Sequence, residues 1–194
     1  MSETITVTTW HLEQTSAGDL RPVPAPEGLD LRLVRADGIG PEFARFLYTS
    51  VGGPWHWTDR LPWTYRAWQE WLAKDGLETW VAWVSGSPAG YVQLEPHPEG
   101  LVEVAYFGLL PGFIGRGLGS HLLSHGLARA WDLADRHPAR PATRRVTVHT
   151  CSLDGPAALR TYGSRGFRLF RTETAEQPAA PAPGPWPGAG PYTA

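Results

Sequence analysis

The sequence predicts an α/β protein of the α+β type, in which helices cover both faces of a mixed, mostly antiparallel sheet of six to seven strands. Two observations lead to this fold class. The expected elements follow the order strand, two helices, three strands, helix, strand, helix, strand, which neither alternates strictly nor repeats. The chain has 194 residues, of which 42% are hydrophobic, and this is enough for one globular domain with its own core.

The first half of the chain contains strands and two amphipathic helices. Residues 4–11 alternate and are rich in β-branched side chains, which predicts an extra edge strand, and segment 16–28 has the prolines and glycines typical of a linker. Pro41 occupies a favoured first helical position, and Gly76 ends the second helix. The expected elements are a core strand at 29–34, helices at 41–50 and 64–75, and strands at 77–84 and 89–94.

The second half begins with a strong hydrophobic strand and a glycine-rich loop. The apolar residues of the long helix that follows recur at helical spacing. The expected elements are a strand at 101–110, a loop at 111–119, a helix at 120–135, a strand at 145–150, a helix at 156–165 and a strand at 167–172. The chain is thus divided into an N-terminal extension (1–28), a domain (29–176) and a Pro/Ala/Gly-rich tail (177–194) that is expected to be disordered.

Composition excludes several classes of protein. The formal net charge of −2 gives no indication of the excess of basic residues that nucleic-acid binding needs. No apolar run approaches the ~20 residues of a membrane span, and residues 1–14 lack the basic start and apolar core of a signal peptide. A single cysteine, Cys151, allows no disulfide within a monomer, so we expect a cytoplasmic protein. The seven histidines are scattered, and no metal site is expected.

The glycine-rich loop is the most informative segment. A strand enters a turn that contains Gly115, Gly117 and Gly119, and the turn continues into a helix. Glycine lets the backbone approach a bulky anion, and the first helical turn presents unpaired N–H groups with a partial positive charge, which together suit a pyrophosphate. A Walker loop would need Lys followed by Ser or Thr, but Ser120 and His121 follow here, and the even spacing of the glycines differs from a dinucleotide fingerprint.

The segment Ile114-Gly-Arg-Gly-Leu-Gly119 resembles motif A of the GCN5-related N-acetyltransferases (GNAT), Gln/Arg-x-x-Gly-x-Gly/Ala. Ile114 departs from that pattern, and Arg116 is the residue that could compensate. The resemblance implies the GNAT-like acyl-CoA N-acyltransferase fold, with acetyl-CoA as cosubstrate and no metal. The residues that it assigns to the cofactor are Leu109, Leu110, Ile114, Gly115, Arg116, Gly117, Leu118, Gly119, Ser120 and Asp154.

A second segment, 154–167, is similar to the closing motif of the same family, Asn-x-x-Ala-x-x-x-Tyr-x-x-x-Gly-Phe. Ala158, Tyr162, Gly166 and Phe167 fall in place, whereas Gly155 stands where Asn is common. A helix and a strand separate the two motifs, as that family requires. The resemblance therefore covers about residues 29–172.

The resemblance also implies catalytic roles. Glu103, on the strand that leads into the loop, corresponds to a catalytic glutamate of several family members and is the expected base, with Glu95 as its rival. Tyr162 is the expected acid, because the family places its hydroxyl near the sulfur of coenzyme A. A main-chain N–H of Leu109 or Leu110 is expected to polarise the thioester carbonyl where a bulge parts two strands.

His149 and Cys151 suggest a different chemistry, since alternate residues of a strand share a face and such a pair can form a covalent nucleophile. No Asn or Asp that would orient the histidine is identifiable. We therefore interpret Cys151 as a buried thiol and His149 as a partly satisfied side chain.

Five of the ten tryptophans lie within residues 55–71, and in the GNAT fold the first two helices and their loop cover the acceptor. Trp68 and Trp71 have helical spacing and are expected in the core. The substrate candidates on the loop are Trp55, His56, Trp57 and Trp63. The aromatic ones either pack onto the sheet or form a wall for a small amine, whose polar groups His56 and Asp59 would orient.

These observations lead to one preferred function and several alternatives. The preferred one is direct transfer of an acetyl group from acetyl-CoA to a primary amine of a small molecule. The alternatives are a protein or peptide N-acetyltransferase, a non-catalytic acyl-CoA-binding module, and a transferase for a longer acyl chain. The expected partner is the amine acceptor, with neither nucleic acid nor membrane, and a homodimer remains open by analogy with the family.

Overall fold

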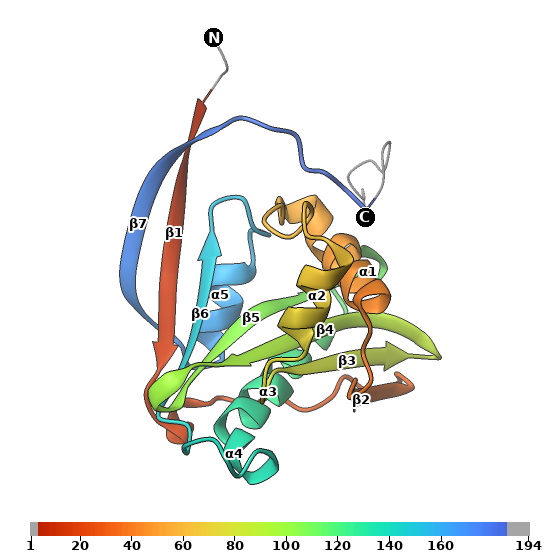
Figure 1. Cartoon of the computed structure of the whole chain (residues 1–194), viewed down its shortest axis with the longest axis vertical. Helices are drawn as coiled ribbons and strands as arrows, with labels where there is room; N and C mark the ends of the chain where they lie inside the picture. Colours follow the sequence, from red (N-terminus) through yellow and green to blue (C-terminus); the bar gives the residue numbers. More distant parts are fainter. Residues whose placement is uncertain (1–3, 186–194) are drawn as a thin grey trace.

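A computed structural model describes residues 4–185 and contains one seven-stranded sheet with the order β2-β3-β4-β5-β6-β1-β7 (Figure 1). Within residues 4–185, β5 and β6 are the only parallel neighbours. The sheet is therefore mixed and mostly antiparallel, as predicted. The strands are β1 Thr4–Gln14, β2 Leu31–Arg35, β3 Glu78–Val84, β4 Ser87–Pro96, β5 Leu101–Leu109, β6 Arg145–Cys151 and β7 Arg168–Pro178.

Helices cover both faces of this sheet (Figure 1). On one face, one hydrophobic cluster joins α1 to α2, and a second joins α1 to strand side chains such as Val81 and Tyr91. On the other face, a third cluster joins α3 and α5 to the strand neighbours Ala82 and Val92. This division follows from the alternation of side chains along β3 and β4. The α-helices are α1 Pro41–Gly52, α2 Tyr65–Leu72, α3 Leu118–Trp131, α4 Leu133–Arg136 and α5 Ala158–Ser164.

Strand β1 is an inner strand of the sheet, whereas the sequence predicted an edge strand. It lies between β6 and β7, and its residues Thr9–Gln14 pair with β6 while almost its whole length pairs with β7 (Figure 1). The exposed edge is β7, and β2, which was expected in the core, is the opposite edge with half-buried side chains. An alternating sequence reports which face of a strand is buried but carries no information about its neighbours.

The linker and the tail also differ from the prediction. In the segment that follows β1, Arg21 N–H donates to Arg165 O (3.2 Å) and Val23 N–H donates to Ser124 Oγ (3.1 Å), so this segment is bound to the folded domain. Strand β7 extends to Pro178, two residues into the expected disordered tail. The end of that tail, residues 186–194, lies outside the described residues, and the division into three parts remains a prediction.

Two further differences concern helices. Helix α3 begins at Leu118, two residues earlier than predicted, and the helix expected at 120–135 is interrupted at Asp132. Among residues 4–185, no helix is both long and apolar enough to cross a bilayer.

Helix α3 packs closely on β4 at Gly126. A Cβ there would lie 2.7 Å from a methyl carbon of Val92, which is fully buried and cannot move aside. We expect Gly126→Ala to lower the free energy of unfolding by about 1–3 kcal/mol, because overpacking outweighs the gain in helix propensity. Gly163→Ala is the matched control, since a Cβ at this α5 position meets no atom within 4 Å. Urea denaturation of both variants checks this, and equal stabilities would refute the close contact.

Candidate active site

Strands β5 and β6 part halfway along the sheet. Their parallel pairing covers only Leu101–Glu103 with Arg145–Thr147, although β5 continues to Leu109 and β6 to Cys151. A cavity of about 450 Å³ opens between them, and α5 and the loop after α1 supply its other walls. Backbone groups that would otherwise bond across the two strands therefore face the cavity.

A bulge in β5 turns side chains toward both faces of the sheet. The register with β4 shifts between Gln93 and Leu94, so that β5 has one extra residue. Val104 and Phe107 pack on the α3 side, whereas Ala105 and Tyr106 both pack on the α1–α2 side. The cavity can therefore be reached by groups from both layers of helices.

Glu103 lies in this cavity between two imidazoles. Its Oε2 is 3.1 Å from His97 Nε2, and its Oε1 is 3.3 Å from His149 Nδ1. The hydrogen bond from His149 lowers the pKa of Glu103 despite partial burial, and the same contact raises the pKa of His149. Glu103 is therefore a stable carboxylate at neutral pH.

Glu95, the rival base, is the direct cross-strand neighbour of Glu103 and also lines the cavity. It is 8% exposed. Its Oε2 accepts a hydrogen bond from Trp71 Nε1 (3.2 Å), and its Oε1 pairs with Lys74 Nζ. This ion pair makes Glu95 less available as a base than Glu103.

Tyr162 reaches the cavity from α5, on the α3 side of the sheet. Its ring packs against Phe107 and Phe167, with centroid distances of 6.0 and 5.9 Å. Burial raises the pKa of Tyr162 well above its ordinary value, so its hydroxyl stays protonated and can donate. The cavity thus joins a protonated phenol and a carboxylate that lie on opposite faces of the sheet.

The glycine-rich turn has the predicted strand–turn–helix form. Gly115 (φ +84°) and Gly117 (φ +75°) adopt left-handed backbone, which a side chain would strain. Gly117 is the N-cap of α3 and has no side chain to cap the N–H groups of Leu118, Gly119 and Ser120. Free donors at the start of a 14-residue helix fit the diphosphate of an acyl-CoA.

The backbone of Leu110 does not fit its predicted role. Its N–H donates to Ala89 O (2.9 Å) across the β4–β5 ladder. Because N–H groups alternate between the two sides of an antiparallel strand, the N–H of its neighbour Leu109 points away from β4, toward the gap. Of the two candidate N–H groups, that of Leu110 is bonded to β4 and that of Leu109 is turned toward the gap.

The remaining predicted cofactor residues have varied surroundings. Ile114 is exposed, and the Arg116 guanidinium lies 5.6 Å from the ring centroid of Phe113. The Asp154 carboxylate accepts hydrogen bonds from Thr150 Oγ1 (2.6 Å) and Cys151 N–H (3.1 Å). Asp154 therefore stabilises the turn between β6 and α5 through its side chain.

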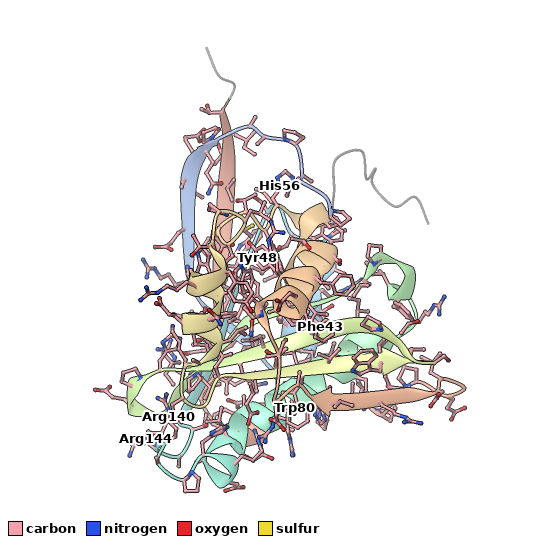
Figure 2. The ribbon with its side chains drawn as sticks, turned by 45° about the vertical axis from the view of Figure 1, so that its right-hand side comes forward. Phe43, Tyr48, His56, Trp80, Arg140 and Arg144 are labelled. Carbon is pink, nitrogen blue, oxygen red and sulfur yellow. The ribbon has the colours of Figure 1, made fainter. Side chains whose placement is uncertain are left out.

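Three of the four predicted acceptor residues, Trp55, His56 and Trp57, line the cavity. Figure 2 shows His56 with Tyr48 on the α1–α2 side of the sheet. Trp63 does not reach the cavity but packs edge to face on Trp68, with centroids 5.5 Å apart. This packing matches the other interpretation of the loop aromatics, in which they complete a core, and an acceptor role for Trp63 stays a prediction.

The sequence analysis did not predict a hydrogen-bond network that contributes to the same cavity. The hydroxyls of Tyr48 and Tyr106 donate to the two oxygens of Asp59 (2.6 and 2.7 Å), and Arg60 Nε donates to the Tyr106 oxygen (2.8 Å). The Arg60 guanidinium is nearly buried, and its Cζ lies 3.3 Å from the Trp71 ring centroid. The adjacent Asp59 and Arg60 were visible in the sequence, but their partners come from other elements.

Cys151 lines the same cavity, yet burial raises its pKa, which disfavours the thiolate. His149 contacts Glu103 rather than the thiol. Both observations agree with the non-nucleophilic interpretation. No cluster of three or more His, Cys, Asp or Glu side chains within residues 4–185 has the arrangement of a metal site.

Comparisons with known proteins agree with this geometry. Residues 44–167 match a sequence model described as the acetyltransferase (GNAT) family. The chain is 30% identical over 162 residues to mycothiol acetyltransferase of Mycobacterium sp. (strain MCS), covering 81% of this chain and 51% of that protein. It is 32% identical over 179 residues to that of Mycobacterium marinum, covering 84% and 55%. The chain thus spans about half the length of these relatives.

Among solved structures, the fold is similar to a GCN5-related N-acetyltransferase from Kribbella flavida, with a TM-score of 0.60 and 18% identity. The match covers 89% of this chain and 58% of that one. At this identity, the likeness concerns the fold alone.

The Tyr106 hydroxyl holds the network of Asp59 and Arg60 together. We expect Tyr106→Phe to lower the free energy of unfolding by about 1–3 kcal/mol, because Arg60 Nε then loses its acceptor in a buried place. Tyr65→Phe is the matched control, since the Tyr65 side chain is exposed on α2. Chemical denaturation tests both variants, and an equal effect of the two would show that the network contributes nothing.

Proposed function

The chain belongs to the GNAT family of acetyltransferases, and on this premise we propose that it transfers the acetyl group of acetyl-CoA directly to a primary amine of a small molecule. The observation that carries this proposal is the gap between β5 and β6. It joins Tyr162 on one side of the sheet to Glu103, Trp55 and Trp57 on the other, and the glycine turn follows the end of β5 along the chain. A thioester in the gap would be open to an amine from one face while its sulfur leaves toward the other.

Each reacting group has a candidate partner in this arrangement. The N–H groups at the start of α3 bind the diphosphate of the cosubstrate, and the Leu109 N–H polarises the acyl carbonyl. The negative charge of Glu103 draws the proton from the amine, which has a pKa of roughly 10 in solution. The protonated hydroxyl of Tyr162 gives its proton to the departing thiolate.

The acceptor is proposed to be small because of the cavity's size and walls. A volume of about 450 Å³ lies in the range of small-molecule sites, and Trp55 and Trp57 contribute apolar surface to its lining. The name of the mycobacterial relatives refers to mycothiol, which supports a small acceptor over a protein. The chain spans about half of their length.

The function is tested with a panel of free amines and peptides, by following thiol release from acetyl-CoA. We expect turnover of at least one free amine, and a fall in kcat of about ten- to ten-thousand-fold for Glu103→Gln and for Tyr162→Phe, because each loses a proton-transfer group. Glu70→Gln and Tyr65→Phe are matched controls on the exposed side of α2. If calorimetry shows no affinity for acetyl-CoA, the proposal is refuted. Turnover of peptides alone would favour the alternative function of a protein or peptide N-acetyltransferase.

Cofactor binding by the glycine turn has a separate test. We expect Gly117→Ala to weaken acetyl-CoA binding about tenfold or more, because a left-handed backbone costs a residue with Cβ about 1–2 kcal/mol and the turn must shift. Gly38→Ala is the control, since Gly38 has no left-handed φ and a Cβ there meets no atom within 4 Å. Calorimetric titration with acetyl-CoA measures both, and unchanged affinity in Gly117→Ala would place the diphosphate elsewhere.

A further inference from the structure

We propose that His149 Nε2 is the atom that takes the proton from the acceptor amine, and that Glu103 is a positioning residue that orients His149. This inference rests on the proposed function and refines it. It replaces direct proton transfer to the carboxylate by transfer to an imidazole that the carboxylate holds.

The contacts of Glu103 are the first argument. Each of its two oxygens faces an imidazole nitrogen, His97 Nε2 at 3.1 Å and His149 Nδ1 at 3.3 Å. The Glu103 side chain is 28% exposed, whereas that of His149 is 54% exposed and lines the cavity. An incoming amine therefore meets the imidazole of His149 more readily than the carboxylate behind it.

The tautomer of His149 is the second argument. A carboxylate only accepts hydrogen bonds, so the nitrogen that faces it, Nδ1, carries the proton. In the neutral ring, the lone pair is then on Nε2, at the far edge from Glu103, and within residues 4–185 no side chain or backbone group is bonded to it. This is the arrangement in which a carboxylate fixes a histidine as a general base.

The charges around the imidazole favour the same assignment. The Glu103 hydrogen bond raises the pKa of His149 above its ordinary 6.5, against partial desolvation, and the more distant Asp154 and Asp59 act in the same direction. The other titratable neighbours are His97 across Glu103, His11 on β1 with ring centroids 6.0 Å apart, and Cys151 on the same strand. A base with a pKa near the working pH is more effective than a carboxylate whose pKa is lowered.

In the proposed step, every bond that forms is matched by one that breaks, and every proton has a donor and an acceptor. The amine nitrogen forms a bond to the acyl carbon, and its proton passes to Nε2 of His149, which becomes an imidazolium paired with Glu103. The carbon–sulfur bond breaks with its electron pair on sulfur, and this thiolate takes the hydroxyl proton of Tyr162. Solvent then removes a proton from His149 and returns one to Tyr162, so that no other reactant is needed.

The experiment compares pH profiles of kcat/KM for wild type, His149→Gln and Glu103→Gln, with the best acceptor from the amine panel. In wild type, we expect kcat/KM to fall as the pH drops below the pKa of His149, because the protonated ring cannot accept. His149→Gln should lose at least about 100-fold in kcat/KM and lose this acidic limb. Glu103→Gln should lose less, and its acidic limb should move to lower pH, because the charge that raises the pKa of His149 is gone.

Two further measurements separate this role from a structural one. Imidazole in the buffer should restore part of the activity of His149→Ala, and NMR titration should give His149 a pKa above 6.5 that falls in Glu103→Gln. His137→Gln, which changes a histidine paired with Glu78 rather than Glu103, is the control and should leave the profile unchanged.

The outcomes distinguish this inference from the proposed function. A loss below about tenfold in His149→Gln, with a larger loss in Glu103→Gln, would overturn the inference and return the proton to the carboxylate, while the acetyltransferase function would stand. Absence of turnover for every amine together with absence of acetyl-CoA binding would overturn both.

Discussion

The separation of β5 from β6 is the constraint on which the rest of the structure depends. A gap in a sheet leaves backbone groups without partners, and such a gap persists only if each strand is held from its other side. Strand β5 keeps its ladder with β4 as far as Leu109, and β6 keeps its ladder with β1 from Val146 to Cys151. The N-terminal strand therefore holds β6 over the very residues that have left β5.

This arrangement also fixes the position of the ionisable groups. Glu103 is the last β5 residue paired with β6, at Thr147, and His149 lies two residues further along the same face of β6. His11 of β1 is the direct cross-strand partner of His149. The backbone of His149 is therefore held by β1, while its ring lines the cavity. A pair that forms where two strands begin to part is held by the ladder and is still accessible to a substrate.

The two layers of helices complete the site with opposite properties. On the α3 side, the turn at Gly115 and Gly117 presents uncapped N–H groups, which suits an anion. On the α1–α2 side, the cavity has aromatic walls supported by the network of Asp59, Arg60 and Tyr106. The sheet lies between these two sides, and groups from both meet at the gap between β5 and β6.

The sequence predicted the local features well, because they depend on neighbouring residues. Helix α1 starts at Pro41 as expected, and the glycine turn has the predicted form, since Pro and Gly restrict or free the backbone where they stand. The order of the expected elements likewise predicted the mixed sheet with helices on both faces. Glu103, Tyr162 and three of the four acceptor candidates line one cavity, and their roles there stay predictions.

Tertiary structure decided the features that depend on which distant segments meet. The alternation of residues 4–11 is the same for an edge strand and an inner one, so only the pairing with β6 and β7 places β1 inside the sheet. The amide of Leu110 is taken by Ala89, Trp63 is drawn into the Trp68 cluster, and Glu103 lies between His97 and His149. By itself, the sequence determined which residues could form each element and each reactive group. Their partners were decided only by the fold, because hydrogen bonds and packing join residues that the chain keeps far apart.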